Sequence, residues 1–189
     1  MNRYGKIPAA VALMLWASVA LAQQNPGGSA EREFDDGKAW VVAEPRTWVI
    51  GSTNIEIVVP RGFVHDKASI PRPLWALLPK SGDYTRATVI HDYLYWTQLC
   101  TREQADNLLM IAMKESGVGW FKRRSIYSGV RLGGASAWDA NKAERDRGLP
   151  RTSPTTDWPP GRTWALYRQE LFVSGYRDAP FPQSAKYCV

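Results

Sequence analysis

The order of apolar and polar positions divides the chain into an extended part followed by a helical part. Three short runs rich in β-branched and aromatic residues come first, and Gly, Pro, Ser and Asn residues separate them. These runs are residues 39–42, 47–50 and 55–59. Residues 51–54 between the last two runs suit a hairpin turn. We therefore expect a small antiparallel sheet of about three strands.

After Asp83 the apolar residues recur at helical spacing. Helices are expected over residues 84–98, 101–114, 120–132 and 164–173. The first is apolar on most sides, which predicts a central, buried helix. The second starts with Thr101 and Gln104 at the spacing of a capping box. Because its connection to the first is short, these two helices should lie adjacent and antiparallel. Together with the strands, the helices predict an α+β fold in which the sheet packs on three or more helices.

The ends of the chain differ in character from its centre. Residues 1–22 have the basic start, apolar core and Ala-Leu-Ala ending of a secretory signal, so we expect an exported chain, periplasmic or secreted, without a stable membrane anchor after cleavage. Residues 23–37 are expected to be a flexible lead-in and residues 38–145 the core domain. Residues 146–189 are expected to form a Pro/Gly-rich extension with one short helix.

Charge and cysteine content narrow the class of protein. The formal net charge is +6, but the basic residues are not clustered as in a nucleic-acid footprint, so we expect no nucleic-acid partner. The only dense basic run, Lys122 to Arg124, is interpreted as a solvated helix face, with a binding patch as the alternative. Cys100 and Cys188 suit one disulfide in an exported protein. Two free thiols, or a thiol linked to a partner, are the alternatives.

Both histidines of the chain precede an aspartate. His91 lies in the first expected helix, and Asp106 lies at a similar height on the antiparallel second helix. Asp106 could therefore hold one ring nitrogen of His91, as a general base requires. Tyr95, four residues after His91, shares its helical face and could join the same network.

The remaining candidates surround this pair. Asp92 points about 100° away from His91 on the helix and is free to bind a hard cation such as Ca²⁺, with oxygen ligands such as Asp66 from a neighbouring loop. That loop also holds His65 and Ser69. Asp66 and Ser69 have the spacing of an Asx or ST turn, and no G-x-S-x-G elbow surrounds Ser69 as a nucleophile would require.

The series His91-Asp92-x-x-Tyr95, followed by Asp106 on the next helix, resembles the catalytic helix pair of secreted and viral phospholipase A2 enzymes. The resemblance implies that His91 activates water, Asp92 binds Ca²⁺, Asp106 orients His91 and Tyr95 adds a hydrogen bond. It also implies a phospholipid substrate or another cell-envelope component as partner. The glycine-rich calcium loop of that family is missing, and residues 62–69 would have to replace it. The candidates for a lipid-facing rim are Trp75, Leu77, Leu78 and Trp96.

A second resemblance covers about residues 38–140. The motifs Val-Pro-Arg-Gly-Phe at 59–63, Asp-Lys-Ala-Ser-Ile-Pro at 66–71, His-Asp-Tyr-Leu-Tyr at 91–95 and Ala-Asp at 105–106 look like the bacterial and phage-associated family called domain of unknown function 1353. This resemblance implies a small α+β domain without an established activity. His65 stands where that family usually has threonine.

Three hypotheses of function remain open at this stage. The chain could be a hydrolase that uses His91 and Asp106. It could be a non-catalytic structural or binding module, of the envelope or derived from a phage, in which the same pair is a buried packing network. It could also be an HD-type metal phosphohydrolase; the residues of that hypothesis are His65, His91, Asp92 and Asp139. No zinc spacing, phosphate-binding glycine loop or dinucleotide fingerprint is present.

Overall fold

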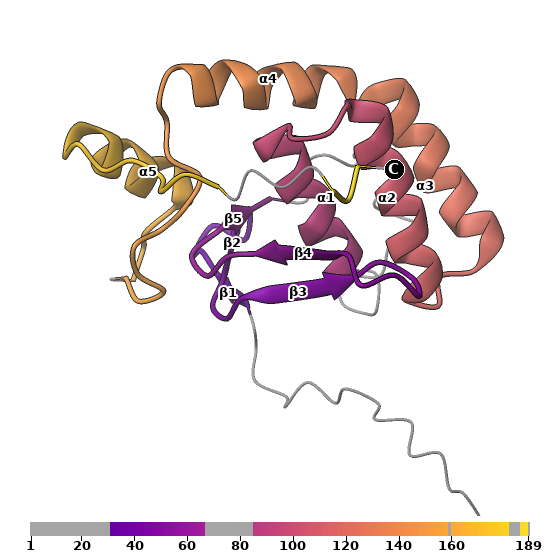
Figure 1. The fold of residues 1–189 in the computed structure, drawn as a ribbon. Coiled ribbons are helices and arrows are strands. Elements are labelled where there is room, and N and C mark those ends of the chain that lie inside the picture. The colour runs from indigo at the N-terminus through magenta and orange to yellow at the C-terminus, as the bar shows by residue number, and fades with distance from the viewer. Residues whose placement is uncertain (1–30, 67–84, 159, 182–185, 189) are drawn as a thin grey trace, which may run out of the picture.

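The structure is a computed structural model that describes residues 31–66, 85–158, 160–181 and 186–188. It confirms the α+β class, with small antiparallel sheets beside a group of helices (Figure 1). The strands are β1 (Glu31–Glu33), β2 (Trp40–Val42), β3 (Arg46–Val49), β4 (Glu56–Val59) and β5 (Val64–His65). The helices are α1 (Thr85–Thr97), α2 (Arg102–Glu115), α3 (Trp120–Gly133), α4 (Ala135–Asp146) and α5 (Trp164–Val173).

The expectation that the three predicted strands share one sheet is wrong, because the strands form two sheets. One has the order β1-β2-β5 and the other pairs β3 with β4, both antiparallel. The expected hairpin is confirmed, with Trp48 paired to Ile57 and both side chains buried. β2 cannot join that hairpin sheet because its two edges already pair with β1 and β5.

The expectation that residues 23–37 are a flexible lead-in is wrong for the last seven of them. Glu31–Glu33 pairs with Val42–Trp40 in reverse order, and Phe34 is buried with its ring stacked on Trp158 at 4.1 Å between centroids. This stretch shows no apolar alternation because it is an edge strand whose anchor, Phe34, comes directly after it.

α1 is the central helix. Every residue from Ala87 to Thr97 is buried, and the helix contacts α2, α4, β4 and β5. α2 begins with the capping box predicted at Thr101 and Gln104, in which each residue's side chain binds the other's backbone N–H. None of the helices in the described part of the chain is long and apolar enough to span a membrane.

α4 is a helix that the sequence analysis did not predict. Two adjacent glycines, Gly133 and Gly134, are more typical of a helix end than of a helix start. Instead, Gly134 alone separates α3 from α4 and is itself buried. One residue is enough to join the two helices because Gly134, having no side chain, fits against Tyr95. Its φ of −78° is an ordinary value.

The C-terminal extension builds a second core rather than an appendage. Val42 of β2 faces the helices, whereas Val41 faces the opposite side of the sheet. On that side lies a cluster formed by Phe34, Ala39, Val41, Val64, Trp158, Trp164 and Leu171. The backbone of Arg151 and Ser153 bonds that of Val64 and Gly62, and α5 lies beyond the sheet from α1 (Figure 1).

The predicted disulfide between Cys100 and Cys188 is present, with Cα atoms 5.3 Å apart. It joins the turn between α1 and α2 to the end of the chain, 88 residues later. The amide of Gln104 also donates to the carbonyl of Cys188. The C-terminus is therefore held against the start of α2.

Candidate functional site

The three residues predicted to act together do meet in the structure. Nε2 of His91 on α1 lies 2.9 Å from Oδ1 of Asp106 on α2. The hydroxyl of Tyr95 donates to the same oxygen at 2.7 Å. An ionised carboxylate only accepts hydrogen bonds, so Nε2 of His91 carries the proton in this pair. The antiparallel packing of α1 and α2 thus places all three side chains as the sequence spacing predicted.

Two arginines that the sequence analysis missed hold the second oxygen of Asp106. Nη1 of Arg131, from α3, lies 3.0 Å from Oδ2, and Nη1 of Arg102 lies 3.4 Å from it. Arg102 also donates to the carbonyls of Val130 and Arg131 at the end of α3. The i, i+4 spacing of Arg102 and Asp106 was a usable signal, whereas Arg131 is brought in only by the packing of α3.

The electrostatics of the network favour an ionised Asp106. Burial by itself raises the pKa of this carboxyl, but hydrogen bonds from His91, Tyr95 and Arg131 outweigh burial and hold the pKa below its usual range. Burial and the neighbouring carboxylate raise the pKa of Tyr95, so its hydroxyl stays protonated. The hydrogen bond to Asp106 raises the pKa of Arg131.

The network is enclosed by protein. His91, Tyr95 and Asp106 each have an exposed fraction of 0%. The Tyr95 ring meets the Trp138 ring edge to face at 5.1 Å, so α4 covers the network from its own side. A groove of about 330 Å³ lies elsewhere, lined by Arg61, Thr152, Thr156, Tyr176 and Phe181 among others, and neither His91 nor Asp106 lines it.

The two predicted calcium ligands are found in different surroundings. Asp92 is buried on α1, with 3% of its surface exposed. Asp66 is half-buried, and its Oδ2 lies 3.4 Å from Nη2 of Arg151. Within the described ranges no group of three or more His, Cys, Asp or Glu side chains is arranged to hold a metal ion. Calcium binding at Asp92 and Asp66 stays a prediction.

His65 was predicted to lie in a loop, but it lies in strand β5, where it pairs with Trp40 of β2. Strand pairing overrides the local Gly and Pro signals because β2 offers a free edge to residues 64–65. The ring is fully buried, and neither of its nitrogens has a hydrogen-bond partner among the described residues. Oε2 of Glu31 is 3.6 Å from Nε2.

Other predicted positions fall outside the network. Ser69, Trp75, Leu77 and Leu78 lie outside the described residues. Trp96, a candidate for a lipid-facing rim, is only 1% exposed, so this expectation is wrong. The reason is that α1 has neighbours on all sides. Asp139, from the phosphohydrolase hypothesis, is exposed on α4.

The fold and the buried network define a small α+β domain organised around an ionised aspartate shared by three helices. Residues 40–130 match the family described as "Protein of unknown function (DUF1353)", so this part of the chain is similar to that family. The match confirms the resemblance seen in the motifs.

One relative is an uncharacterized protein, y4jT, of Sinorhizobium fredii (strain NBRC 101917 / NGR234). It is 35% identical over 74 residues, which is 38% of this chain and 22% of that protein. The chain therefore spans about a fifth of the length of this curated relative. No solved structure matches the chain.

Proposed function

We propose that this chain is a non-catalytic structural or binding module in which the His91–Asp106 network fixes the packing of the helices. The observation that carries the proposal is the complete burial of both side chains, together with the four donors that surround Asp106. A general base must reach the proton it removes, directly or through one water. A ring with no exposed surface does not meet that condition.

The network has the features of a packing device. Asp106 accepts from His91 and Tyr95 on α1, from Arg102 on α2 and from Arg131 on α3, so its carboxylate joins three helices. A fully satisfied buried network specifies one arrangement of a core, because every alternative arrangement leaves a donor or an acceptor unpaired. In this reading, helix packing is the role of His91.

An exported, envelope-associated location belongs to the same proposal. Residues 1–22 have the composition of a secretory signal, and disulfides such as Cys100–Cys188 form and persist in oxidising compartments. A module that fixes its helices with one buried network and one disulfide suits an extracytoplasmic role. Its partners would then be components of the envelope or of a phage particle.

A hydrolase is the second candidate, and one observation favours it. Nε2 of His91 faces Oδ1 of Asp106 at 2.9 Å, as in sites where a carboxylate orients a catalytic imidazole. The resemblance to phospholipase A2, the predicted Ca²⁺ at Asp92 and Asp66, and a phospholipid substrate all belong to this candidate.

One experiment separates the two candidates. The purified chain, His91→Ala and the surface control Asp139→Asn are compared for unfolding by urea and for hydrolysis of a fluorogenic phospholipid with and without Ca²⁺. The structural proposal expects His91→Ala to lower the free energy of unfolding by about 2 kcal/mol, because Asp106 loses a buried partner. It also expects no turnover by any of the three proteins. Calcium-dependent turnover that disappears in His91→Ala, with unfolding unchanged, would overturn it and establish the hydrolase.

A further inference from the structure

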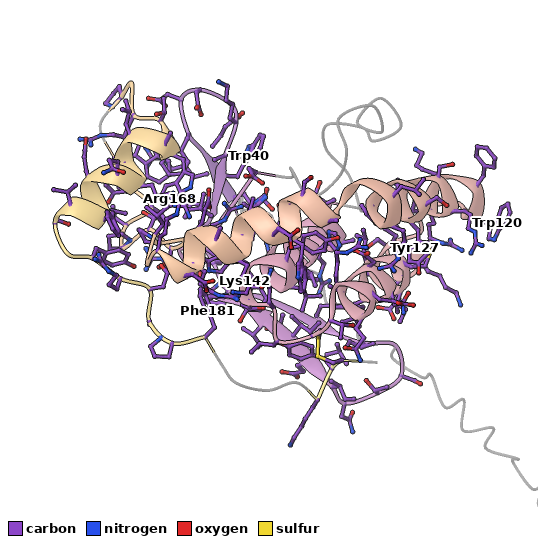
Figure 2. The ribbon with its side chains drawn as sticks, turned by 90° about the horizontal axis from the view of Figure 1, so that it is seen from above. Trp40, Trp120, Tyr127, Lys142, Arg168 and Phe181 are labelled. Carbon is purple, nitrogen blue, oxygen red and sulfur yellow. A yellow bond between two sulfur atoms is a disulfide. The ribbon has the colours of Figure 1, made fainter. Side chains whose placement is uncertain are left out.

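The start of α3 exposes two large aromatic side chains at adjacent positions. Trp120 is 69% exposed and Phe121 74% exposed. Trp120 lies at the outer edge of the molecule, at the free end of the helix (Figure 2). Gly117 and Gly119, which precede it, have open space around them. The aromatic pair therefore forms a projecting tip rather than part of a groove.

The outward face of α3 continues from this tip. At 100° per residue, Trp120, Phe121, Arg124 and Leu132 fall within an arc of about 120°. Leu132 is 88% exposed. The buried residues of the helix, Ile126 and Val130, lie toward the opposite side. α3 thus has one face packed on the domain and a second face, on which Trp120, Phe121 and Leu132 are exposed, turned to solvent.

Unneutralised positive charge accompanies the exposed aromatic residues. Lys122 and Arg124 follow Phe121 directly, and neither forms an ion pair with any residue that the structure describes. α3 has no acidic residue in its first turn. The nearest acidic residue before it, Glu115, is engaged by the indole of Trp48 and the backbone of Gly51.

We propose that this face of α3, defined by Trp120, Phe121, Arg124 and Leu132, with Lys122 beside it in the first turn, docks the protein on an anionic lipid surface. Aromatic side chains favour the boundary between lipid headgroups and acyl chains, and Lys and Arg favour the negative surface beside it. Lys122 can keep its ammonium in the headgroup layer while its stem covers apolar surface. The proposal goes beyond the function proposed above and holds whether or not His91 is catalytic.

A lipid surface fits this face better than a protein partner does. The two aromatic side chains, 69% and 74% exposed, offer roughly 200–350 Å² between them, since each buries roughly 150–250 Å² when fully covered. A stable protein interface buries about 800 Å² on each partner. A narrow, convex tip with basic residues at its base instead suits shallow insertion between headgroups.

The test uses the full chain and vesicles of phosphatidylcholine with about one third phosphatidylglycerol, a mixture whose surface is negative. Flotation is compared for the parent chain, Trp120→Ala/Phe121→Ala, Lys122→Glu/Arg124→Glu and the control Leu166→Ala. Leu166 is 61% exposed on α5 and so matches the aromatic residues in exposure but not in position. All variants share residues 1–22, so any binding by that apolar segment is common to them.

The charge variant should bind at least tenfold more weakly than the parent chain, because each basic residue near an anionic surface contributes about fivefold. The aromatic variant should also bind at least tenfold more weakly, because it lacks the side chains that favour the boundary between headgroups and acyl chains. Leu166→Ala should bind as the parent does. Vesicles with brominated acyl chains should quench part of the tryptophan fluorescence, and Trp120→Phe should remove that part.

Two results would overturn the proposal. One is equal vesicle binding by the parent chain, the aromatic variant and the charge variant, including the case in which none of them binds. The other is self-association of the parent chain without lipid that the aromatic variant abolishes, because the face would then be an interface between copies of the protein.

Discussion

The hydroxyl oxygen of Tyr95 lies 2.5 Å from the position that a Cβ atom on Gly134 would occupy. The carbonyl oxygen of Val130 lies equally close to that position. The junction between α3 and α4 therefore approaches the buried network more closely than any side chain permits. This contact explains why α4 can cover Tyr95.

Gly134→Ala should destabilise the protein by about 2 kcal/mol, because the new methyl group must displace the Tyr95 hydroxyl or the backbone of α3. Gly119→Ala is the matched control. Gly119 also has a negative φ, and no atom lies within 4 Å of its added Cβ, so its stability should change little. Unfolding of both variants in urea measures the difference. Equal midpoints for the two variants would contradict the close approach.

Asp106→Asn should lower the free energy of unfolding by about 3 kcal/mol. The amide has the shape of the carboxylate, but it removes the charge that Arg131 and Arg102 surround and leaves buried donors without an acceptor. Asp139→Asn, on the exposed face of α4, should be neutral. Urea denaturation at neutral pH tests both. A loss no larger than that of Asp139→Asn would show that the network does not hold the helices together.

The contribution of Asp106 should also depend on pH. Its pKa in the folded protein is lower than the ordinary 3.8, so the unfolded chain binds a proton more readily than the folded one at acidic pH. The stabilisation is therefore fully present above pH 3.8 and is lost as the pH falls through the lower pKa of the folded state. The difference in unfolding free energy between the parent chain and Asp106→Asn, measured across this range, should shrink on acidification. A constant difference would argue against an ionised Asp106.

The two histidines should respond differently to replacement by leucine. His65→Leu removes a buried ring whose nitrogens have no hydrogen-bond partner in the part of the chain that the structure describes, so stability should stay the same or rise by up to about 1 kcal/mol. His91→Leu should be destabilising by about 2 kcal/mol because Asp106 loses a donor. Thermal melts at neutral pH compare the pair. Equal losses would mean that His65 has a polar role in the sheet.

Reduction of the Cys100–Cys188 disulfide should destabilise the chain by about 4 kcal/mol, because the bond closes a long loop in the unfolded state. Urea unfolding with and without dithiothreitol measures this effect. A Cys100→Ser/Cys188→Ser variant, which reductant cannot affect, is the control. If reductant shifts the variant as much as the parent chain, the effect does not come from the disulfide.

Local signals were sufficient for much of this fold. The apolar spacing of residues 84–98, the capping box at Thr101 and the alternation in β3 and β4 each depend on neighbours within a few positions. For the same reason the meeting of His91, Tyr95 and Asp106 was predictable. A short connection between two helices leaves little freedom in how they pack, so heights counted along each helix predict the contact.

Only the tertiary structure decided the rest. The pairing of β1 with β2, the second core around Trp158 and Trp164, and the contact of Arg131 with Asp106 join segments far apart in the sequence. No local pattern encodes such contacts, because they arise when buried surfaces find partners across the whole chain. The sequence determined which residues could form a polar network at the centre of this protein. Packing by α3 and α4 decided that the network would be enclosed.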